Sequence, residues 1–158
     1  MLEADVRAAV QSAIELVRNE SPQLDFHSVH ERSTAHRLAV HMEPFFGPEW
    51  NVDCEYDRDG QTRKALEGIA HCKQQKETDA ILPDIIVHHR GDRGRDHNLL
   101  VIELKKDDTA DVCDQRKLEL LTCRGGQYGY QFGLYINIEG GKFKPTWYKD
   151  GQRLPDPS

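Results

Sequence analysis

Two short apolar runs joined by a glycine-containing loop constrain the fold of this chain more than any other feature. The runs cover residues 81–87 and 99–105, and both are rich in isoleucine, leucine and valine. Each is short enough to be a buried β-strand. Residues 91–96 lie between them, contain two glycines and predict the tip of a hairpin. We therefore expect the two runs to pair as adjacent antiparallel strands.

Each apolar run carries an acidic residue at a polar edge. Asp84 follows Pro83 in the first run, and Glu103 precedes Lys105 at the end of the second. Because strand side chains alternate between faces, Glu103 and Lys105 project from the same side. Mg²⁺ prefers oxygen ligands, and one or two carboxylates with a substrate phosphate can hold it. Asp84 and Glu103 are therefore predicted metal ligands, and Lys105 is predicted to orient water or stabilise phosphate oxygens.

These residues resemble the motif of the PD-(D/E)xK nuclease superfamily, which contains restriction endonucleases, junction resolvases and many small repair or defence nucleases. Asp84 matches the first acidic position, Glu103 the second and Lys105 the lysine. The expected elements over residues 28–138 also follow an order similar to that of the family. This order is a helix, a strand, the two motif-bearing strands, a helix and a strand.

The resemblance implies both a fold and an activity. The fold is α/β and restriction-endonuclease-like, with a mixed central sheet of about four to five strands flanked by helices. The activity is Mg²⁺-dependent hydrolysis of DNA phosphodiester bonds, with Mn²⁺ as a possible substitute and repair or defence as the setting. A homodimer is compatible with the resemblance.

A helix predicted over residues 28–42 raises two interpretations of Glu31. In the first, Ser28 is the N-cap and Glu31 its partner in a capping box. In the second, Glu31 lies on the apolar stripe with Ala35 and Leu38, where a carboxylate needs a partner. The resemblance implies that such a Glu is an auxiliary acid of the metal site. Both interpretations remain open from the sequence.

The helix that follows the second motif strand contributes two further candidates. Lys117 is a tentative phosphate contact, although an ion pair with Asp114 within the helix is the simpler structural interpretation. Lys106, next to Lys105, is the other tentative substrate residue.

The remaining pattern fits a single domain over residues 1–158, because this length matches one ordinary α/β core. Apolar residues at three- and four-residue spacing predict an N-terminal helix within residues 1–20. Residues 63–78 predict a partly helical insertion, either a basic flap or an ordinary surface connection. Other expected elements are a strand at 50–56, a helix at 109–124, strands at 130–138 and 142–148, and a tail at 153–158.

The formal net charge of −6 argues against a nucleic-acid partner, because it gives no global attraction for a polyanion. The basic residues near the proposed site and the C-terminus offset this only if the fold gathers them on one face. They are Lys105, Lys106, Arg116, Lys117, Arg124, Lys142, Lys144 and Lys149.

Cysteine and histidine patterns suggest no zinc motif. The four cysteines lack Cys-x-x-Cys spacing, so reduced thiols are expected. His88 shares the strand parity of Asp84 and is either a residue of the outer site or a polar strand end. With no apolar run near the ~18 residues of a membrane span and no signal-like start, we expect no membrane association and a cytoplasmic location.

The leading hypothesis is therefore a metal-dependent deoxyribonuclease. The alternative is a noncatalytic interaction or regulatory module that retains a nuclease-like fold and binds an unidentified protein partner.

Overall fold

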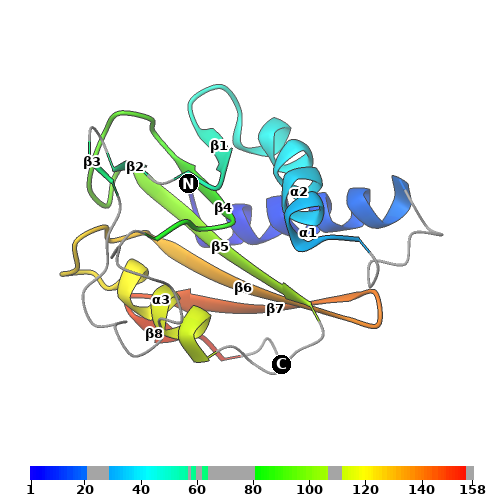
Figure 1. Ribbon diagram of the computed structural model, residues 1–158. Helices are drawn as coiled ribbons and strands as arrows, with labels where there is room; N and C mark the ends of the chain where they lie inside the picture. Colours follow the sequence, from blue (N-terminus) through cyan, green and yellow to red (C-terminus); the bar gives the residue numbers. More distant parts are fainter. Residues whose placement is uncertain (21–28, 57, 60–61, 64–80, 107–111, 156–158) are drawn as a thin grey trace.

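A mixed β-sheet with helices on both faces organises the computed structural model (Figure 1). The structure describes residues 1–20, 29–56, 58–59, 62–63, 81–106 and 112–155. Within these ranges the main sheet has six strands in the order β1-β4-β5-β6-β7-β8. Only β5 and β6 pair in parallel; the other neighbours are antiparallel. The elements are α1 (Glu3–Glu20), α2 (Glu31–Phe46), β1 (Asn51–Cys54), β2 (Arg58–Asp59), β3 (Thr62–Arg63), β4 (Ile85–His88), β5 (Asn98–Lys106), α3 (Val112–Thr122), β6 (Phe132–Glu139), β7 (Lys142–Lys149) and β8 (Gln152–Arg153).

Strand β5 lies inside the sheet and is covered on both faces. Leu100, Ile102 and Leu104 belong to the apolar cluster that includes the buried faces of α1 and α2. Val101 belongs to a second cluster, formed with residues of α3 and several tyrosines. A strand covered on both sides is expected to be almost continuously apolar, which explains the run in the sequence. The predicted antiparallel hairpin of β4 and β5 is confirmed.

The two N-terminal helices confirm the predicted helices, with one shifted boundary. α1 buries Val6, Val10 and Val17 on one stripe, as its spacing predicts. The predicted end of the second helix at residue 42 is wrong, because α2 continues through Pro44 to Phe46. Phe46 is only 3% exposed, so the last turn of α2 buries an aromatic side chain.

The sheet is larger than the predicted four to five strands because the chain turns back once more at its end. Asp150 and Gly151 both have positive φ, of 52° and 80°, and join β7 to β8. An Asp-Gly pair with positive φ is the preferred two-residue hairpin connection. The predicted tail at 153–158 is therefore wrong at Arg153, which pairs with Tyr148 of β7.

Several predictions fall partly or wholly outside the described residues. These concern the Ser28 cap, most of the 63–78 insertion and the start of the 109–124 helix. Of the cysteines, Cys54 and Cys123 are free, as expected. Cys113 is disulfide-bonded, so the prediction of reduced thiols is wrong for this residue. In the part of the chain that the structure describes, none of the helices has the length and apolar character of a membrane span.

Gly133 allows α3 to pack closely on β6. A Cβ at this position would lie 2.8 Å from Thr122 Cγ2 and 3.2 Å from Tyr148 Cβ. Thr122 is fully buried and its hydroxyl donates to Leu118 O at 2.8 Å, so its side chain has little freedom to yield. The absence of a side chain at Gly133 therefore sets the distance between α3 and the sheet.

We predict that Gly133→Ala lowers the free energy of unfolding by about 1–3 kcal/mol, the usual cost of overpacking. Chemical denaturation followed by circular dichroism measures this value. Gly125→Ala is the control, because a Cβ there meets no atom within 4 Å. Equal stability of the two variants would contradict close packing at Gly133.

Candidate active site

Asp84 and Glu103 come together where β4 begins. Ile85 pairs with Ile102 in the antiparallel register. The residue before Ile85 is Asp84 and the residue after Ile102 is Glu103, so continuing the register places these two opposite each other. Directly opposed residues have Cβ atoms about 4.5–5.5 Å apart and share a face. Ile86 and Val101 belong to the apolar cluster with α3. Residues two apart along a strand share a face, so Asp84 and Glu103 also lie on the α3 side of the sheet. The two predicted metal ligands are thus neighbours on adjacent strands.

Strand β5 extends beyond the start of β4, and two carboxylates bind the backbone N–H groups that β4 leaves uncovered. Leu104 N donates to Asp84 Oδ2 at 2.7 Å. Lys106 N donates to Glu31 Oε1 at 3.1 Å. Because these N–H groups are two residues apart, they lie about 7 Å from each other along the strand. Asp84 and Glu31 are therefore positioned along one edge by main-chain donors.

The start of α2 bears on the two interpretations of Glu31. The N-cap of this helix is His30, and it makes no side-chain capping hydrogen bond. Ser28, the predicted cap, lies outside the described residues, and the N-cap position of α2 falls two residues later. Glu31 is instead the first residue of α2, and its carboxylate reaches across to the end of β5.

Helix α3 brings a lysine and a third carboxylate onto Glu103. Lys117 Nζ lies 3.4 Å from Glu103 Oε1 and 2.5 Å from Asp114 Oδ1. The predicted Asp114–Lys117 pair is confirmed, and Lys117 in addition bridges to the sheet. Glu103 Oε1 is buried and has no hydrogen-bond partner among the described residues. The ion pair with Lys117 therefore compensates its charge.

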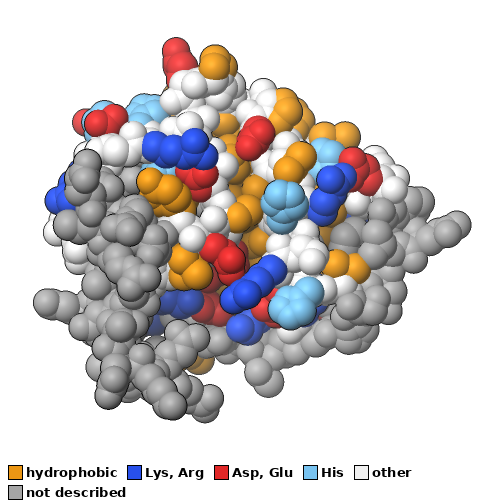
Figure 2. Space-filling model, turned by 45° about the horizontal axis from the view of Figure 1, so that its top comes forward, with side chains coloured by type: hydrophobic (Ala, Val, Ile, Leu, Met, Phe, Trp, Pro, Cys, Tyr) orange, Lys and Arg blue, Asp and Glu red, His pale blue; other side chains and the backbone are white. Residues whose placement is uncertain are grey.

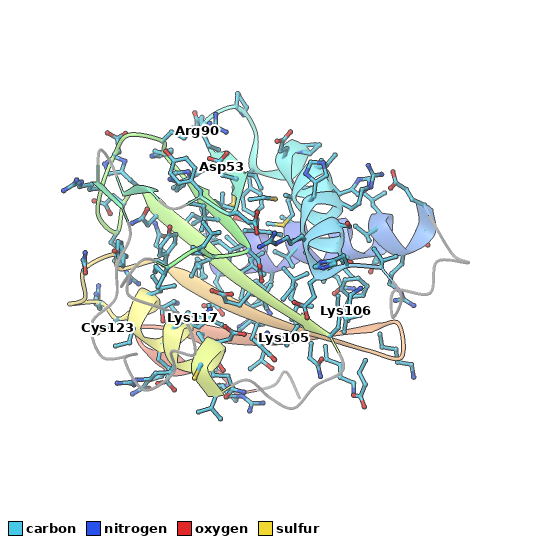
Figure 3. All side chains as sticks on the ribbon, viewed as in Figure 1. Asp53, Arg90, Lys105, Lys106, Lys117 and Cys123 are labelled. Atoms are coloured by element: carbon cyan, nitrogen blue, oxygen red, sulfur yellow. The ribbon has the colours of Figure 1, made fainter. Side chains whose placement is uncertain are left out.

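The lysines of β5 lie at the same end of the strand (Figure 3). Lys105 Nζ lies 3.7 Å from Asp114 Oδ2, and its side chain is 36% exposed. Lys117 is less accessible, with a side-chain exposure of 22%. Lys106, the other tentative substrate residue, is half-buried, and its amide holds Glu31. Lys105 is thus the more exposed of the two amines that contact Asp114.

Burial dominates the electrostatics of the two facing carboxyls. It raises the pKa of Glu103 to about 8, with Lys117 opposing and Asp84 adding to the rise. Burial likewise raises the pKa of Asp84 to about 6, opposed by the hydrogen bond from Leu104 N. Burial alone would lower the pKa of Lys117, but the carboxylates of Glu103 and Asp114 raise it. The site therefore favours a cation beside its carboxylates, and the ammonium of Lys117 is one such cation.

Most of the basic residues expected to form a positive face have acidic neighbours. Lys105 and Lys117 contact the carboxylates of the site, as described above. Three more form ion pairs elsewhere: Arg116 with Glu119 at 2.7 Å, Lys149 with Glu3 at 2.9 Å, and Lys144 with Glu139. Figure 2 shows acidic and basic side chains interspersed on one face, without a continuous area of either sign. The charge of these residues is thus largely offset locally.

His88 does not join the candidate site. It is 3% exposed, and its Nε2 lies 2.9 Å from Asp53 Oδ2. Arg90 Nε donates to the same oxygen at 2.8 Å. This cluster lies four residues from Asp84 along the strand, about 14 Å away. His88 is therefore a polar strand end with a carboxylate partner, which was the simpler of the two interpretations.

Asp114 is the residue of the site that the sequence analysis did not select. It is only 7% exposed and contacts both Lys105 and Lys117. Asp114 lies three residues before Lys117, and the 3.6-residue period of a helix puts both on one face; this period is the sequence signal for Asp114.

Comparison with known proteins adds no identification: no protein-family model, curated protein or solved structure matches this chain.

We predict that, without metal, the free energy of unfolding falls as pH rises from about 4.5 to about 8 because of Glu103. Its pKa in the folded state is about 8 against an ordinary 4.5, so the folded protein binds the proton more tightly. That stabilisation is complete below pH 4.5 and is lost as pH rises through 8. Each pKa unit corresponds to about 1.4 kcal/mol, so the loss amounts to a few kcal/mol.

Denaturant titrations at several pH values, with a chelator present, measure this effect. Glu103→Gln is expected to flatten the dependence, because its amide has no charge to bury. Glu15→Gln, on the exposed face of α1, is the control and is expected to follow the wild type. Identical slopes for Glu103→Gln and the wild type would contradict the assignment.

Proposed function

We propose that this chain is a metal-dependent nuclease that hydrolyses DNA phosphodiester bonds, a member of the PD-(D/E)xK superfamily with a restriction-endonuclease-like fold. The observation that carries the proposal is the position of Asp84, directly before β4, opposite Glu103 of β5 and near Lys105 and Lys117. The order of elements and the mixed sheet support it as well.

The donor set fits Mg²⁺, with Mn²⁺ as a substitute. Asp84 and Glu103 offer only oxygen atoms, which hard cations prefer. Two carboxylates that face each other in a buried place repel, and Glu103 Oε1 lacks a hydrogen bond among the described residues. A divalent cation compensates both effects. Bound there, Mg²⁺ would supply an activated water and offset negative charge on the reacting phosphate.

The surrounding residues have separate roles in this proposal. Glu31 accepts a hydrogen bond from Lys106 N and so lies at the same end of β5 as the two metal ligands. There it is an auxiliary acid of the metal site. Lys105, the more exposed amine, stabilises the phosphate oxygens or orients the water. Lys117 opposes the rise of the Glu103 pKa that burial causes, and Asp114 positions both lysines.

DNA as the substrate follows from the resemblance of the motif, not from the charge of the molecule. The net charge of −6 and the locally paired basic residues give weak long-range attraction for a polyanion. Binding then relies on contacts at the site itself, where a metal ion adds two positive charges. A dimer would bring two such sites to one duplex.

The alternative, a noncatalytic interaction or regulatory module, is favoured by one observation. Lys117 already neutralises Glu103 and Asp114, so a protein without metal has a satisfied ion-pair network. Such a network can be a purely structural bond between α3 and the sheet.

We predict that the purified protein cleaves DNA in the presence of Mg²⁺ or Mn²⁺. Asp84→Asn and Glu103→Gln are each expected to reduce cleavage by at least about 100-fold, because each removes a charged metal ligand. A panel of linear, branched and single-stranded DNA, with RNA for comparison, identifies the substrate class.

The matched control is Glu15→Gln, which removes one exposed carboxylate outside the site. Calorimetric titration with Mn²⁺ is measured in parallel on all variants. Absence of both cleavage and metal binding in the wild type would favour the interaction module. Full activity of either site variant would exclude the proposed ligands.

We predict that the two lysines affect cleavage differently. Lys117→Met removes the cation beside Glu103, so the pKa of this carboxyl rises further and the acidic limb of the pH–rate profile moves to higher pH. Lys105→Met lowers the rate with little change in that limb, because the amine of Lys105 lies 3.7 Å from Asp114, whereas Lys117 lies 3.4 Å from Glu103 Oε1. Equal shifts in both variants would contradict these separate roles.

A further inference from the structure

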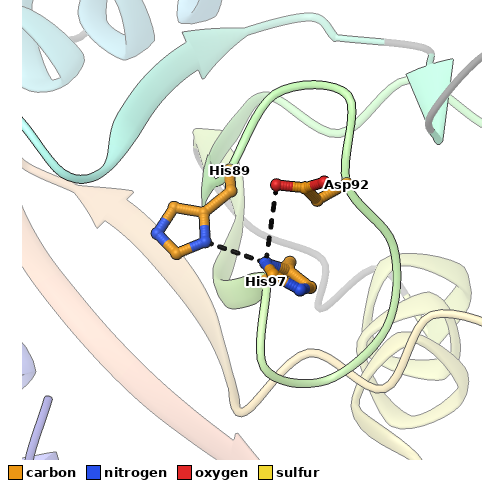
Figure 4. Close-up of side chains that lie close together, drawn as sticks. All are labelled: His89, Asp92 and His97. Carbon is orange, nitrogen blue, oxygen red and sulfur yellow. Dashed lines mark hydrogen bonds and ion pairs between the residues drawn. The ribbon is translucent and has the colours of Figure 1, made fainter.

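The tip of the β4–β5 hairpin contains a second group of potential metal ligands, distant from the carboxylates. His89, Asp92 and His97 each offer one ligand atom, and these atoms all lie within 4.8 Å of one another (Figure 4). His89 is five residues from Asp84 along the strand direction, about 17 Å. The two groups thus lie at opposite ends of the hairpin.

A change of register brings the two histidines together. Val87 pairs with Leu100, but His88 pairs with Asn98, so Leu99 is an extra residue on β5. Without this bulge, His89 would face Asn98. With it, His89 N donates to His97 O at 2.9 Å, and the two histidines become neighbours across the hairpin. Bulges commonly re-aim side chains in this way.

The ligand atoms are oriented toward one another. His89 Nδ1 and His97 Nδ1 are 3.0 Å apart, and Asp92 Oδ2 lies 3.7 Å from the same nitrogen of His97. Two nitrogens bound to one zinc ion at about 2.0–2.1 Å are separated by about 3.3 Å in tetrahedral geometry. These two distances therefore need adjustment by only a few tenths of an ångström to enclose a cation, and all three ligand atoms lie within 4.8 Å of one another.

The frame that holds the ligands is already ordered. Asp92 N donates to His89 O at 3.3 Å and His97 N to Gly94 O at 3.0 Å, so the turn is closed by its own backbone. Trp50 stacks on the His89 ring with centroids 4.0 Å apart and planes at 20°. Little conformational freedom of this ring remains to be lost on binding a metal.

We propose that His89, Asp92 and His97 bind a divalent transition cation of the zinc type. Imidazole nitrogens favour Zn²⁺, Co²⁺ or Ni²⁺, whereas Mg²⁺ prefers oxygen. Three protein ligands leave a fourth position for water, and Asp92 is exposed to solvent. The bound cation cross-links the two limbs of the hairpin and stabilises the strands that carry Asp84 and Glu103. This inference does not depend on the proposed nuclease activity.

The test is a Co²⁺ titration of the metal-free full chain, followed by visible absorption, with excess Mg²⁺ present to occupy the carboxylates. We expect one tightly bound Co²⁺ whose absorption band disappears when Zn²⁺ is added. His89→Ala and His97→Ala are expected to weaken binding at least about tenfold, since even residues that only orient metal ligands have effects of this size. Asp92→Asn, at an exposed turn position, keeps the fold and is expected to weaken binding as well.

Two matched variants make the result specific. His36→Ala removes an exposed histidine of α2 and is expected to leave Co²⁺ binding unchanged. Glu103→Gln is expected to do the same, which separates this site from the carboxylates. As an independent readout, Zn²⁺ raises the thermal midpoint of the wild type but not that of His97→Ala. Wild-type affinity no higher than that of His97→Ala would overturn the proposal and leave only a hydrogen-bonded histidine pair.

Discussion

The structure depends on how one sheet accommodates a buried carboxylate in its longest strand, β5. Glu103 is 4% exposed, and an ionised carboxylate in such a place is costly unless a cation accompanies it. Lys117 supplies that cation from α3. The position of α3 therefore affects both the charge around Glu103 and the packing on the sheet.

Packing on β6 and the ion pairs on β5 constrain the same helix. Gly133 lets Thr122 approach the sheet closely, and Leu118 and Leu121 fill the second apolar cluster. Lys117 and Asp114 lie on the same helix and reach the carboxylate and the lysine of β5. A change that displaces α3 is thus expected to alter the charges around Glu103 even when it touches none of the site residues.

The β4–β5 hairpin separates two kinds of ligand chemistry. At one end, carboxylates bind the N–H groups that β4 leaves uncovered on β5. At the other end, a bulge aligns two imidazoles with one exposed carboxylate. Oxygen ligands and nitrogen ligands select different cations, so one hairpin can present two sites without competition between them.

The sequence alone determined most of the elements and which of their residues share a face, because both follow from local periods of two and 3.6 residues. It identified the hairpin, α1 and α2, and the common side of Glu103 and Lys105. Tertiary structure decided the rest. The approach of Asp114 to Lys105, the contact of Glu31 with Lys106 N and the alignment of His89 with His97 all join residues whose distance depends on helix docking or strand register. Docking and register arise from packing over the whole sheet, and no local pattern encodes them.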